Sequence, residues 1–274
     1  MPELPEVETI ARGLANRVTG DEIETVWLGE KPEPLKSTPQ EILAALEHTR
    51  IEHVRREGKH IVLDLRGPKG TPDDARQWIV HLGMTGRMLV AEADTEVEKH
   101  THAIAKLKSG RELRFVDPRR FGRLSVTQPG QGFKGPGTEP LDISLEDFIV
   151  LFKGRKTPIK SALLNQKLLH GVGNIYADES LFRAGIRPLR QAGRLKPDEL
   201  KRLHTALRHV LREAIKLGGS SVSDYVGADG EKGFFQLKHN VYLRTGEPCR
   251  KCKTPIKRIV LGGRGTHYCP KCQK

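Results

Sequence analysis

The positions of apolar residues predict one helix at the start of the chain and strands after it. Residues 3–18 carry an apolar side chain every three or four positions, with Glu6 and Glu8 in the first turn and Gly20 beyond the end. This spacing is typical of an amphipathic helix. The apolar patterns that follow predict eight short strands, at residues 23–28, 51–55, 60–65, 78–82, 88–91, 103–107, 112–116 and 123–126. Many short strands at close spacing indicate a β-sandwich or barrel with the first helix packed beside it.

The pattern becomes helical in the second half of the chain. Residues 128–142 contain four glycines and three prolines without periodicity, so we place a linker at 131–142. Helices are predicted at 145–153, 159–164, 175–184 and 197–217, and one more, in the first half, at 40–46. The Ser-, Gly- and Asp-rich stretch 220–236 is expected to be a long exposed loop.

All four cysteines lie near the end of the sequence, in the pattern C-x2-C-x16-C-x2-C at Cys249, Cys252, Cys269 and Cys272. This spacing brings four thiolates together as ligands of one structural Zn²⁺, and four protein ligands leave no open position for catalysis. Two disulfides are the alternative, which strained bridges between adjacent C-x2-C cysteines disfavour. Two β-branched runs flank Gly262-Gly263 between the cysteine pairs, and they predict a hairpin with Arg264 at its tip.

These patterns together predict an α+β multidomain protein. The expected order is an N-terminal β-sandwich domain with an N-terminal helix at 1–130, a helical domain at 143–235 and a C-terminal zinc-finger β-hairpin at 236–274.

Charge is distributed unevenly over the 274 residues, whose formal net charge is +13. Residues 1–130 contain 20 Lys and Arg against 21 Asp and Glu, whereas residues 131–274 contain 27 against 13. A basic half attracts a polyanion, for which nucleic acid is the first candidate and a merely solubilising surface the alternative. No apolar run reaches the roughly 18 residues of a membrane span. The first residues have no basic segment typical of a signal peptide, so a cytoplasmic protein is expected.

Three further motifs could contact a nucleic acid. Two glycines precede the predicted helix at Asn174, where free backbone N–H groups could hold a phosphate, although a plain helical corner has the same pattern. The segments 81–86 and 117–122 place an apolar side chain at a turn, next to arginines in the second case. Such tips can insert into a base stack, but a turn with its apolar residue tucked into the core is the common alternative.

Pro2 followed by Glu3 permits two interpretations. Proline and glutamates are ordinary residues at a helix start. If Met1 is removed, however, Pro2 exposes a secondary amine that loses its proton more easily than a lysine does and can attack a sugar carbon to form an imine. The carboxylate beside it could then move protons.

Five segments decide between these interpretations by their resemblance to a known family. MPELPEVET, HLGMTGRM, DPRRFGR, GVGNIYADESLF and TGEPCRKCKTPIKRIVLGGRGTHYCPKCQ resemble, in the same order along the chain, the bacterial formamidopyrimidine-DNA glycosylases, also called 8-oxoguanine DNA glycosylases. The resemblance implies a helix–two-turn–helix DNA-binding domain. It also implies a base-excision repair enzyme that removes oxidised purines and nicks the abasic site by β,δ-elimination.

The resemblance also implies roles for individual residues. Pro2 would be the nucleophile and Glu3 the proton donor and acceptor. Glu6 would be a supporting acid, and Lys59 a strand lysine that assists chemistry. Arg264 is expected both among the catalytic residues and among the DNA contacts. Met84, Arg119 and Phe121 would fill the gap left by the flipped nucleotide. The remaining expected residues contact DNA or belong to a loop over the lesion, namely His81, Lys156, Asn174, Tyr242 and Arg264 for DNA, and Ser221 and Tyr225 for the loop. The expected partner is a duplex with an oxidised purine opposite cytosine, bound by a monomer with no membrane contact.

Two alternatives remain from the sequence. The related endonuclease VIII branch prefers oxidised pyrimidines, but its opening resembles PEGPE, and this chain has PELPE and the long 220–236 segment. A non-catalytic DNA-binding zinc protein would not need Pro2, Glu3, Glu6 and Lys59 together.

Overall fold

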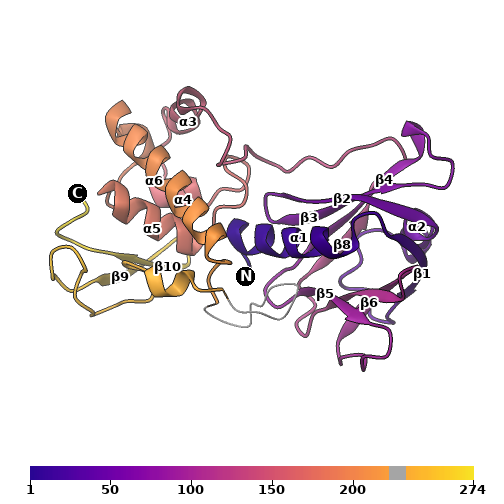
Figure 1. Cartoon of the computed structure of the whole chain (residues 1–274). Helices are drawn as coiled ribbons and strands as arrows, with labels where there is room; N and C mark the ends of the chain where they lie inside the picture. Colours follow the sequence, from indigo (N-terminus) through magenta and orange to yellow (C-terminus); the bar gives the residue numbers. More distant parts are fainter. Residues whose placement is uncertain (222–232) are drawn as a thin grey trace. The chain divides into compact units, whose positions relative to one another are not determined.

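The computed structural model describes residues 1–221 and 233–274 (Figure 1). It contains two compact units. One comprises Met1–Lys134 and Gly218–Gly233, and the other comprises Gly135–Leu217 and Phe234–Lys274. The first division falls inside the predicted linker 131–142. The boundaries of the three predicted domains remain a prediction. None of the described helices is long and apolar enough to cross a membrane.

The first unit is built on one antiparallel sheet that contains all eight predicted strands. Its order is β5-β7-β6-β1-β2-β3-β4-β8. The observed strands match the predicted ones or extend them by up to three residues at an end, except that β4 ends one residue before the predicted end at 82. They are β1 (Glu22–Leu28), β2 (Thr49–Glu57), β3 (His60–Arg66), β4 (Ala75–His81), β5 (Arg87–Glu92), β6 (Thr101–Leu107), β7 (Arg111–Val116) and β8 (Arg123–Val126).

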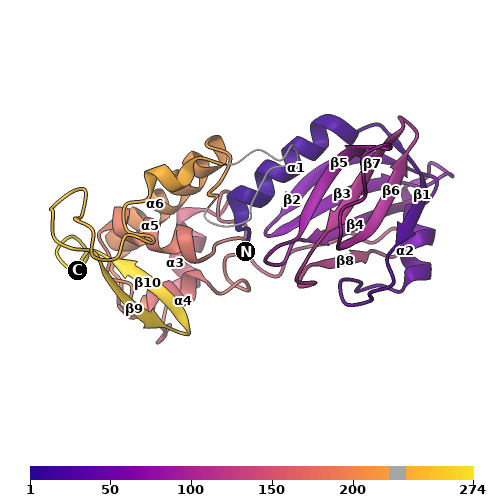
Figure 2. The same cartoon turned by 90° about the horizontal axis from the view of Figure 1, so that it is seen from below.

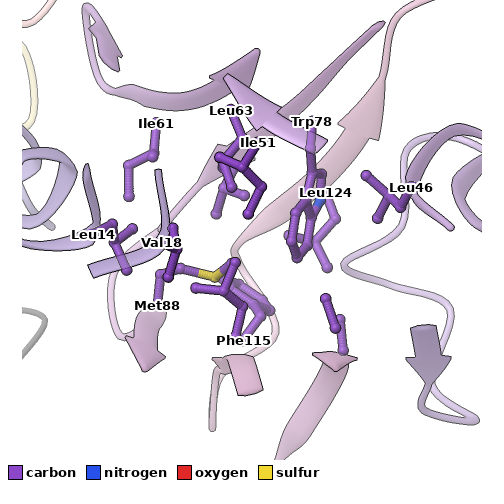
Figure 3. Close-up of a cluster of buried hydrophobic side chains, with 14 of the residues drawn as sticks. Leu14, Val18, Leu46, Ile51, Ile61, Leu63, Trp78, Met88, Phe115 and Leu124 are labelled. Carbon is purple, nitrogen blue, oxygen red and sulfur yellow. The ribbon is translucent and has the colours of Figure 1, made fainter. Parts of the chain in front are cut away.

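The sheet is joined at its middle by a short pairing, since β1 and β2 share only Glu22↔Arg50 and Ile23↔Thr49. The halves on either side contribute to one core. Ile61 and Trp78 come from one half and Phe115 from the other, and all three are fully buried in one cluster (Figure 3). The predicted sandwich is therefore confirmed.

Two helices complete this core. Helix α1 (Leu4–Val18) packs against β2, β3 and β5 (Figure 2) and buries the apolar face that the spacing predicted. Helix α2 (Pro39–Leu46) contributes Ile42 and Leu46. A single-turn 3₁₀ helix, η1 (Pro72–Asp74), leads into β4.

Two connections between the halves of the sheet lie side by side. Residues 82–86 lead from β4 to β5, and residues 117–122 lead from β7 to β8. They are neighbours because β4 pairs with β8 through His81↔Arg123 while β5 pairs with β7 through Arg87↔Val116. The two tip motifs singled out in the sequence thus meet at one end of the sandwich.

The second unit is helical with a small hairpin, as predicted. Its elements are α3 (Leu145–Phe152), α4 (Ile159–Leu163), α5 (Asn174–Ala184), α6 (Pro197–Lys216), the 3₁₀ helices η2 (Ala192–Arg194) and η3 (Phe235–Lys238), β9 (Lys257–Leu261) and β10 (Arg264–Tyr268). Gly262 and Gly263 both have positive φ, +56° and +73°, which is the two-residue turn expected between β9 and β10.

The prediction of an exposed loop over 220–236 was wrong at both of its described ends. Ser220 is buried, and Phe235 is fully buried at the start of η3, where its ring centroid lies 5.5 Å from that of Tyr176. Polar composition suggested exposure, but the apolar ring of Phe235 packs against the buried Tyr176. Residues 222–232, which include Tyr225, lie outside the described residues.

Helix α5 contains a buried acid that joins three segments of this unit. Asp178 is fully buried, and its Oδ1 lies 2.7 Å from Lys160 Nζ of α4. Its Oδ2 accepts a hydrogen bond of 2.8 Å from the backbone N–H of His267 in β10. Lys160 Nζ also donates to the carbonyl of Gly265 and to Thr266 Oγ1, so α4, α5 and β10 are held by one charged network.

We expect Lys160→Met to lower the free energy of unfolding by about 3–5 kcal/mol, because it leaves the Asp178 carboxylate buried without its cation. The double variant Lys160→Met/Asp178→Asn should recover part of this loss. Chemical denaturation of the full chain measures the effect, with the exposed Lys201→Met on α6 as control, expected within about 0.5 kcal/mol of wild type. Equal losses in both lysine variants would contradict the network.

Candidate functional site

The start of α1 holds the first group of predicted site residues, Pro2, Glu3 and Glu6. Glu3 is the residue preceding the helix, and Glu3 and Glu6 are only 4% and 2% exposed. The Glu3 backbone N–H donates to Glu6 Oε2 at 2.9 Å, which satisfies one of the free donors at a helix start. The second carboxylate oxygen, Oε1, accepts a hydrogen bond of 2.7 Å from the Ser220 backbone N–H.

Glu6 thereby connects residues more than 200 positions apart. Gly219 makes this approach possible, since its φ is +81° and a Cβ there would lie 2.9 Å from Cγ and Oε1 of Glu6. Ser221 follows directly, and its Oγ accepts a hydrogen bond of 2.8 Å from the Gly233 N–H. Ser221, a predicted loop residue, therefore directly follows the residue that binds Glu6.

Lys59 is in a turn, which corrects its expected position in a strand. Glu57 pairs with His60, so Gly58 and Lys59 form a two-residue turn between β2 and β3, with Gly58 at φ +60°. The turn forms at this place because Gly58 can adopt a positive φ, and the pairing of Glu57 with His60 then leaves Lys59 in the turn. Lys59 is nevertheless only 8% exposed.

His81 lies across from the same hairpin, at the end of β4. Its ring centroid is 5.0 Å from that of His60, with which it pairs in the sheet. Burial lowers the pKa of His81 to about 4, and the neighbouring charges of His60, Arg123 and Lys59 act in the same direction. His81 Nδ1 accepts a hydrogen bond from the Gly83 N–H at 3.1 Å, which requires the unprotonated nitrogen that this low pKa provides.

The two tip motifs expose their apolar residues. Met84 is 43% exposed and Phe121 is 53% exposed, so the alternative in which they are tucked into the core is wrong. Arg119 is exposed as well, and its Cζ lies 4.8 Å from the centroid of the Phe121 ring, as in a cation–π pair. Large exposed apolar side chains of this kind indicate an interaction surface.

In the second unit, α5 and β10 bring predicted DNA contacts together. Asn174 opens α5 after Gly173, and its Nδ2 donates to the carbonyl of Gly265 at 3.0 Å, next to the exposed Arg264. Residues ninety positions apart therefore form one candidate anion site at a helix N-terminus. Lys156 is exposed in the connection between α3 and α4.

Tyr242 is held near β10 by a second buried acid of α5. Glu179 is fully buried, and Oε1 accepts from the backbone N–H groups of Asn240, Val241 and Tyr242, each at 2.9 Å. The Tyr242 ring packs edge-on against His267 of β10, with centroids 5.2 Å apart.

The four cysteines form one cluster with the geometry of a zinc site. Their Sγ atoms all lie within 4.8 Å of one another, and the cysteines are free rather than disulfide-bonded. A tetrahedral ion with Zn–S distances near 2.3 Å places sulfurs about 3.8 Å apart. The observed 3.9 Å for Cys249–Cys272 and 3.4 Å for Cys252–Cys269 fit that geometry. The donor set fills all four positions, so the metal has a structural role.

Some residues that shape these sites escaped the sequence analysis, namely Thr85, Asp117, Lys160, Asp178 and Glu179. Each is a polar residue with at least one partner from a remote segment, so no local spacing indicates that contact. The one available signal is that Asp178 and Glu179 interrupt an otherwise apolar part of α5.

Comparison with known proteins identifies the class of protein to which the chain belongs. Three family models match successive parts of the chain: the formamidopyrimidine-DNA glycosylase N-terminal domain at residues 1–124, the formamidopyrimidine-DNA glycosylase H2TH domain at 136–226, and a zinc finger found in FPG and IleRS at 246–274. The protein is therefore a DNA glycosylase with a zinc finger.

Relatives extend this over the whole chain. A formamidopyrimidine-DNA glycosylase of Solibacter usitatus is 45% identical, with both chains fully covered. The crystal structure of the MutM (FPG) protein from Thermus thermophilus superposes with a TM-score of 0.86 at 43% identity, covering 99% of this chain and 98% of that one. Lactococcus lactis Fpg in complex with DNA containing an abasic site gives 0.88 at 34% identity, covering 99% of both. The chain belongs to the formamidopyrimidine-DNA glycosylase family, and the resemblance in its motifs is confirmed.

Removal of zinc is expected to unfold the β9–β10 hairpin while the sandwich stays folded. The cysteines Cys249 and Cys269 are fully buried and form a small core with Val241 and Ile256, which has little to hold it once the thiolates are unligated. Hydrogen exchange after chelation should show amides of β9 and β10 losing protection and those of β2–β4 keeping theirs. Unchanged protection in the hairpin after verified zinc loss would contradict a structural role.

His81→Asn is expected to make stability less sensitive to acid. The folded pKa of His81 lies below the ordinary value of 6.5, so its neutral form stabilises the fold above about pH 6.5, and this contribution disappears as the pH falls toward 4. A pKa difference of this size corresponds to roughly 3 kcal/mol. The unfolding free energy is measured at pH 7 and at pH 4 for each protein. The drop between the two should be about 2–3 kcal/mol smaller in His81→Asn than in wild type. The control is His53→Asn, at an exposed position, in which the drop should equal that of wild type.

Proposed function

We propose that this protein removes oxidised purines, such as 8-oxoguanine and formamidopyrimidines, from duplex DNA and then nicks the abasic site. The observation that carries the proposal is the buried arrangement of Glu3 and Glu6 directly behind Pro2, at the start of α1. Family membership supports the substrate class. A mutant of Lactococcus lactis FPG, 34% identical to this chain, has been solved in complex with a Fapy-dG containing DNA.

The proposed chemistry begins with loss of Met1, which converts Pro2 from an amide into a secondary amine. That nitrogen attacks C1′ of the damaged nucleotide, and the bond from C1′ to the base breaks, with a proton going to the departing base or sugar. The C1′–O4′ bond then breaks, O4′ takes a proton, and C1′ and the nitrogen form an iminium ion, which withdraws electrons from the opened sugar. A proton at C2′ is then removed, the 3′-phosphate leaves, and a second elimination releases the 5′-phosphate.

The neighbouring acids divide this work. Glu3 lies next to the amine and is the group that donates and accepts protons during base loss and elimination. Glu6 positions the backbone of Glu3 and Ser220, because its two carboxylate oxygens accept hydrogen bonds from their N–H groups. Lys59 supplies a positive charge for the sugar–phosphate of the damaged nucleotide.

DNA binding is assigned to residues of both units. Met84, Arg119 and Phe121 replace the extruded nucleotide in the stack, which offsets part of the few kcal/mol that extrusion costs. Asn174 and Arg264 bind backbone phosphate at the N-terminus of α5. The other proposed contacts are His81, Lys156 and Tyr242, with Ser221 and Tyr225 in the segment that covers the lesion. One structural zinc ion, a monomeric state, a preference for cytosine opposite the lesion and a cytoplasmic location complete the proposal.

Borohydride trapping tests the imine. The Met1-free protein is incubated with duplexes that contain 8-oxoguanine opposite cytosine, a formamidopyrimidine, an oxidised pyrimidine or no lesion. A covalent adduct is expected with the two purine lesions. Its formation should fall at least tenfold in Pro2→Gly, where a primary amine replaces the secondary one, and at least a hundredfold in Glu3→Gln, which loses the carboxyl that moves protons.

Glu8→Gln is the matched control. Glu8 lies on the same helix but pairs with Arg12 and Arg56, at 2.7 and 2.8 Å, so its loss should leave trapping within about twofold of wild type. DNA affinity should stay within about threefold in Pro2→Gly. If the wild-type protein forms no adduct, the proposed imine chemistry is wrong. Preferential trapping on the oxidised pyrimidine would overturn the proposed substrate class.

A further inference from the structure

We propose that Thr85 and Asp117 are positioning residues, whose hydrogen bond joins the segments 82–86 and 117–122 into one rigid wedge for displacing the damaged nucleotide. This inference rests on the proposed function, since it concerns how Met84 and Phe121 are presented. The name wedge is used below for these two segments together.

A hydrogen bond between two side chains, those of Thr85 and Asp117, links the two segments of the wedge. Thr85 Oγ1 donates to Asp117 Oδ1 at 2.6 Å. Thr85 lies next to Met84, and Asp117 begins the segment that ends with Phe121 and Gly122. The bond therefore connects the residue next to Met84 with the first residue of the segment that carries Phe121.

Asp117 is built to fix its own segment as well. The residue is 0% exposed. Its Oδ2 accepts from the Gly122 N–H at 2.7 Å, and Oδ1 also accepts from the Arg119 N–H at 3.2 Å. Its backbone carbonyl accepts from His102 Nε2 at 3.0 Å. A buried carboxylate with these donors closes the turn around Phe121 and costs free energy if any donor is withdrawn.

The backbones of the two segments touch, which makes their relative position specific. Gly83 has φ +63°, and a Cβ there would lie 2.5 Å from the carbonyl carbon of Phe121 and 2.6 Å from the Gly122 nitrogen. At Gly122 a Cβ would lie 2.5 Å from Phe115 Cζ, a fully buried ring of β7. Glycine at position 83 allows the two segments to approach, and glycine at position 122 lets its segment lie against the ring of Phe115. The Thr85–Asp117 bond then fixes the position of one segment relative to the other.

This arrangement has a consequence for the insertion step. Met84 and Phe121 must enter the duplex together, and residues that are already ordered lose less conformational entropy on doing so. Asp117 and Thr85 do not need to touch DNA for this effect. Their loss should slow base extrusion more than it slows chemistry on DNA from which the base is already missing.

Thr85→Val tests the cross-connection selectively, because it removes the hydroxyl and keeps the branched shape, while Asp117 retains its bonds to Arg119 and Gly122. Thr85→Ser keeps the hydroxyl and is the matched control. With ¹³C-methyl-methionine labelling, only Met1, Met84 and Met88 give signals. Met84 is 43% exposed and Met88 is fully buried, so the Met88 signal is an internal reference for the fold.

In the free protein, Thr85→Val is expected to shift and sharpen the Met84 methyl signal, as mobility increases, and to leave Met88 unchanged. Thr85→Ser should resemble wild type in both signals. A Met84 signal that is unchanged in Thr85→Val would overturn the proposal, and so would a change of equal size at Met88, which indicates general loss of structure.

Single-turnover kinetics provide the second readout. Excision of 8-oxoguanine opposite cytosine should fall about tenfold in Thr85→Val and less than twofold in Thr85→Ser, whereas borohydride trapping on a preformed abasic site should stay within about twofold in both. Equal losses on the two substrates would show a structural role only and would contradict the proposal. If the wild-type protein excises no lesion, the proposed function fails, and the methionine signals still decide whether the bond orders Met84.

Discussion

A carboxylate that leaves water must be surrounded by donors or cations, and four buried acids of this protein meet that requirement in the same way. Glu6, Asp117, Asp178 and Glu179 are all at most 2% exposed, and each accepts hydrogen bonds from the backbone of a segment near a candidate functional residue. Because an unpaired buried charge is expensive, each acid fixes the conformation of the segment that supplies its donors. The candidate sites depend on this constraint.

The acids that order the backbone and the residues proposed to act on DNA are therefore different residues. Glu6 binds the N–H of Glu3, and Glu3 is the acid to which the proposed proton transfer is assigned. Asp117 is enclosed at the base of its turn, whereas Phe121 at the tip is exposed. In the second unit Asp178 binds the backbone of β10, whose first residue is the exposed Arg264. A functional side chain can remain exposed and still be well positioned because a neighbouring carboxylate orders its backbone.

The sequence predicted local features closely. Alternation located every strand of the sandwich, and glycine pairs and the cysteine spacing located the hairpin and the metal ligands, since these patterns act over a few residues. Errors arose where the register of a strand pair or a distant partner decides. Lys59 was expected in a strand, but the pairing of Glu57 with His60 places it in the turn. The polar stretch after residue 219 was expected to be exposed, but Glu6 captures Ser220 and the Tyr176 ring packs against Phe235.

By itself the sequence determined the secondary structure, the zinc ligands, the basic second half and, through its motifs, the family. Only the tertiary structure decided that Met84 and Phe121 are exposed rather than core residues, that the two tips adjoin, and that Asn174 lies against Gly265 next to Arg264. The physical reason is range. Periodicity and ligand spacing are short-range properties of the chain, whereas the environment of Asp117 or Asp178 exists only after strands and helices distant in sequence have packed and water has been excluded.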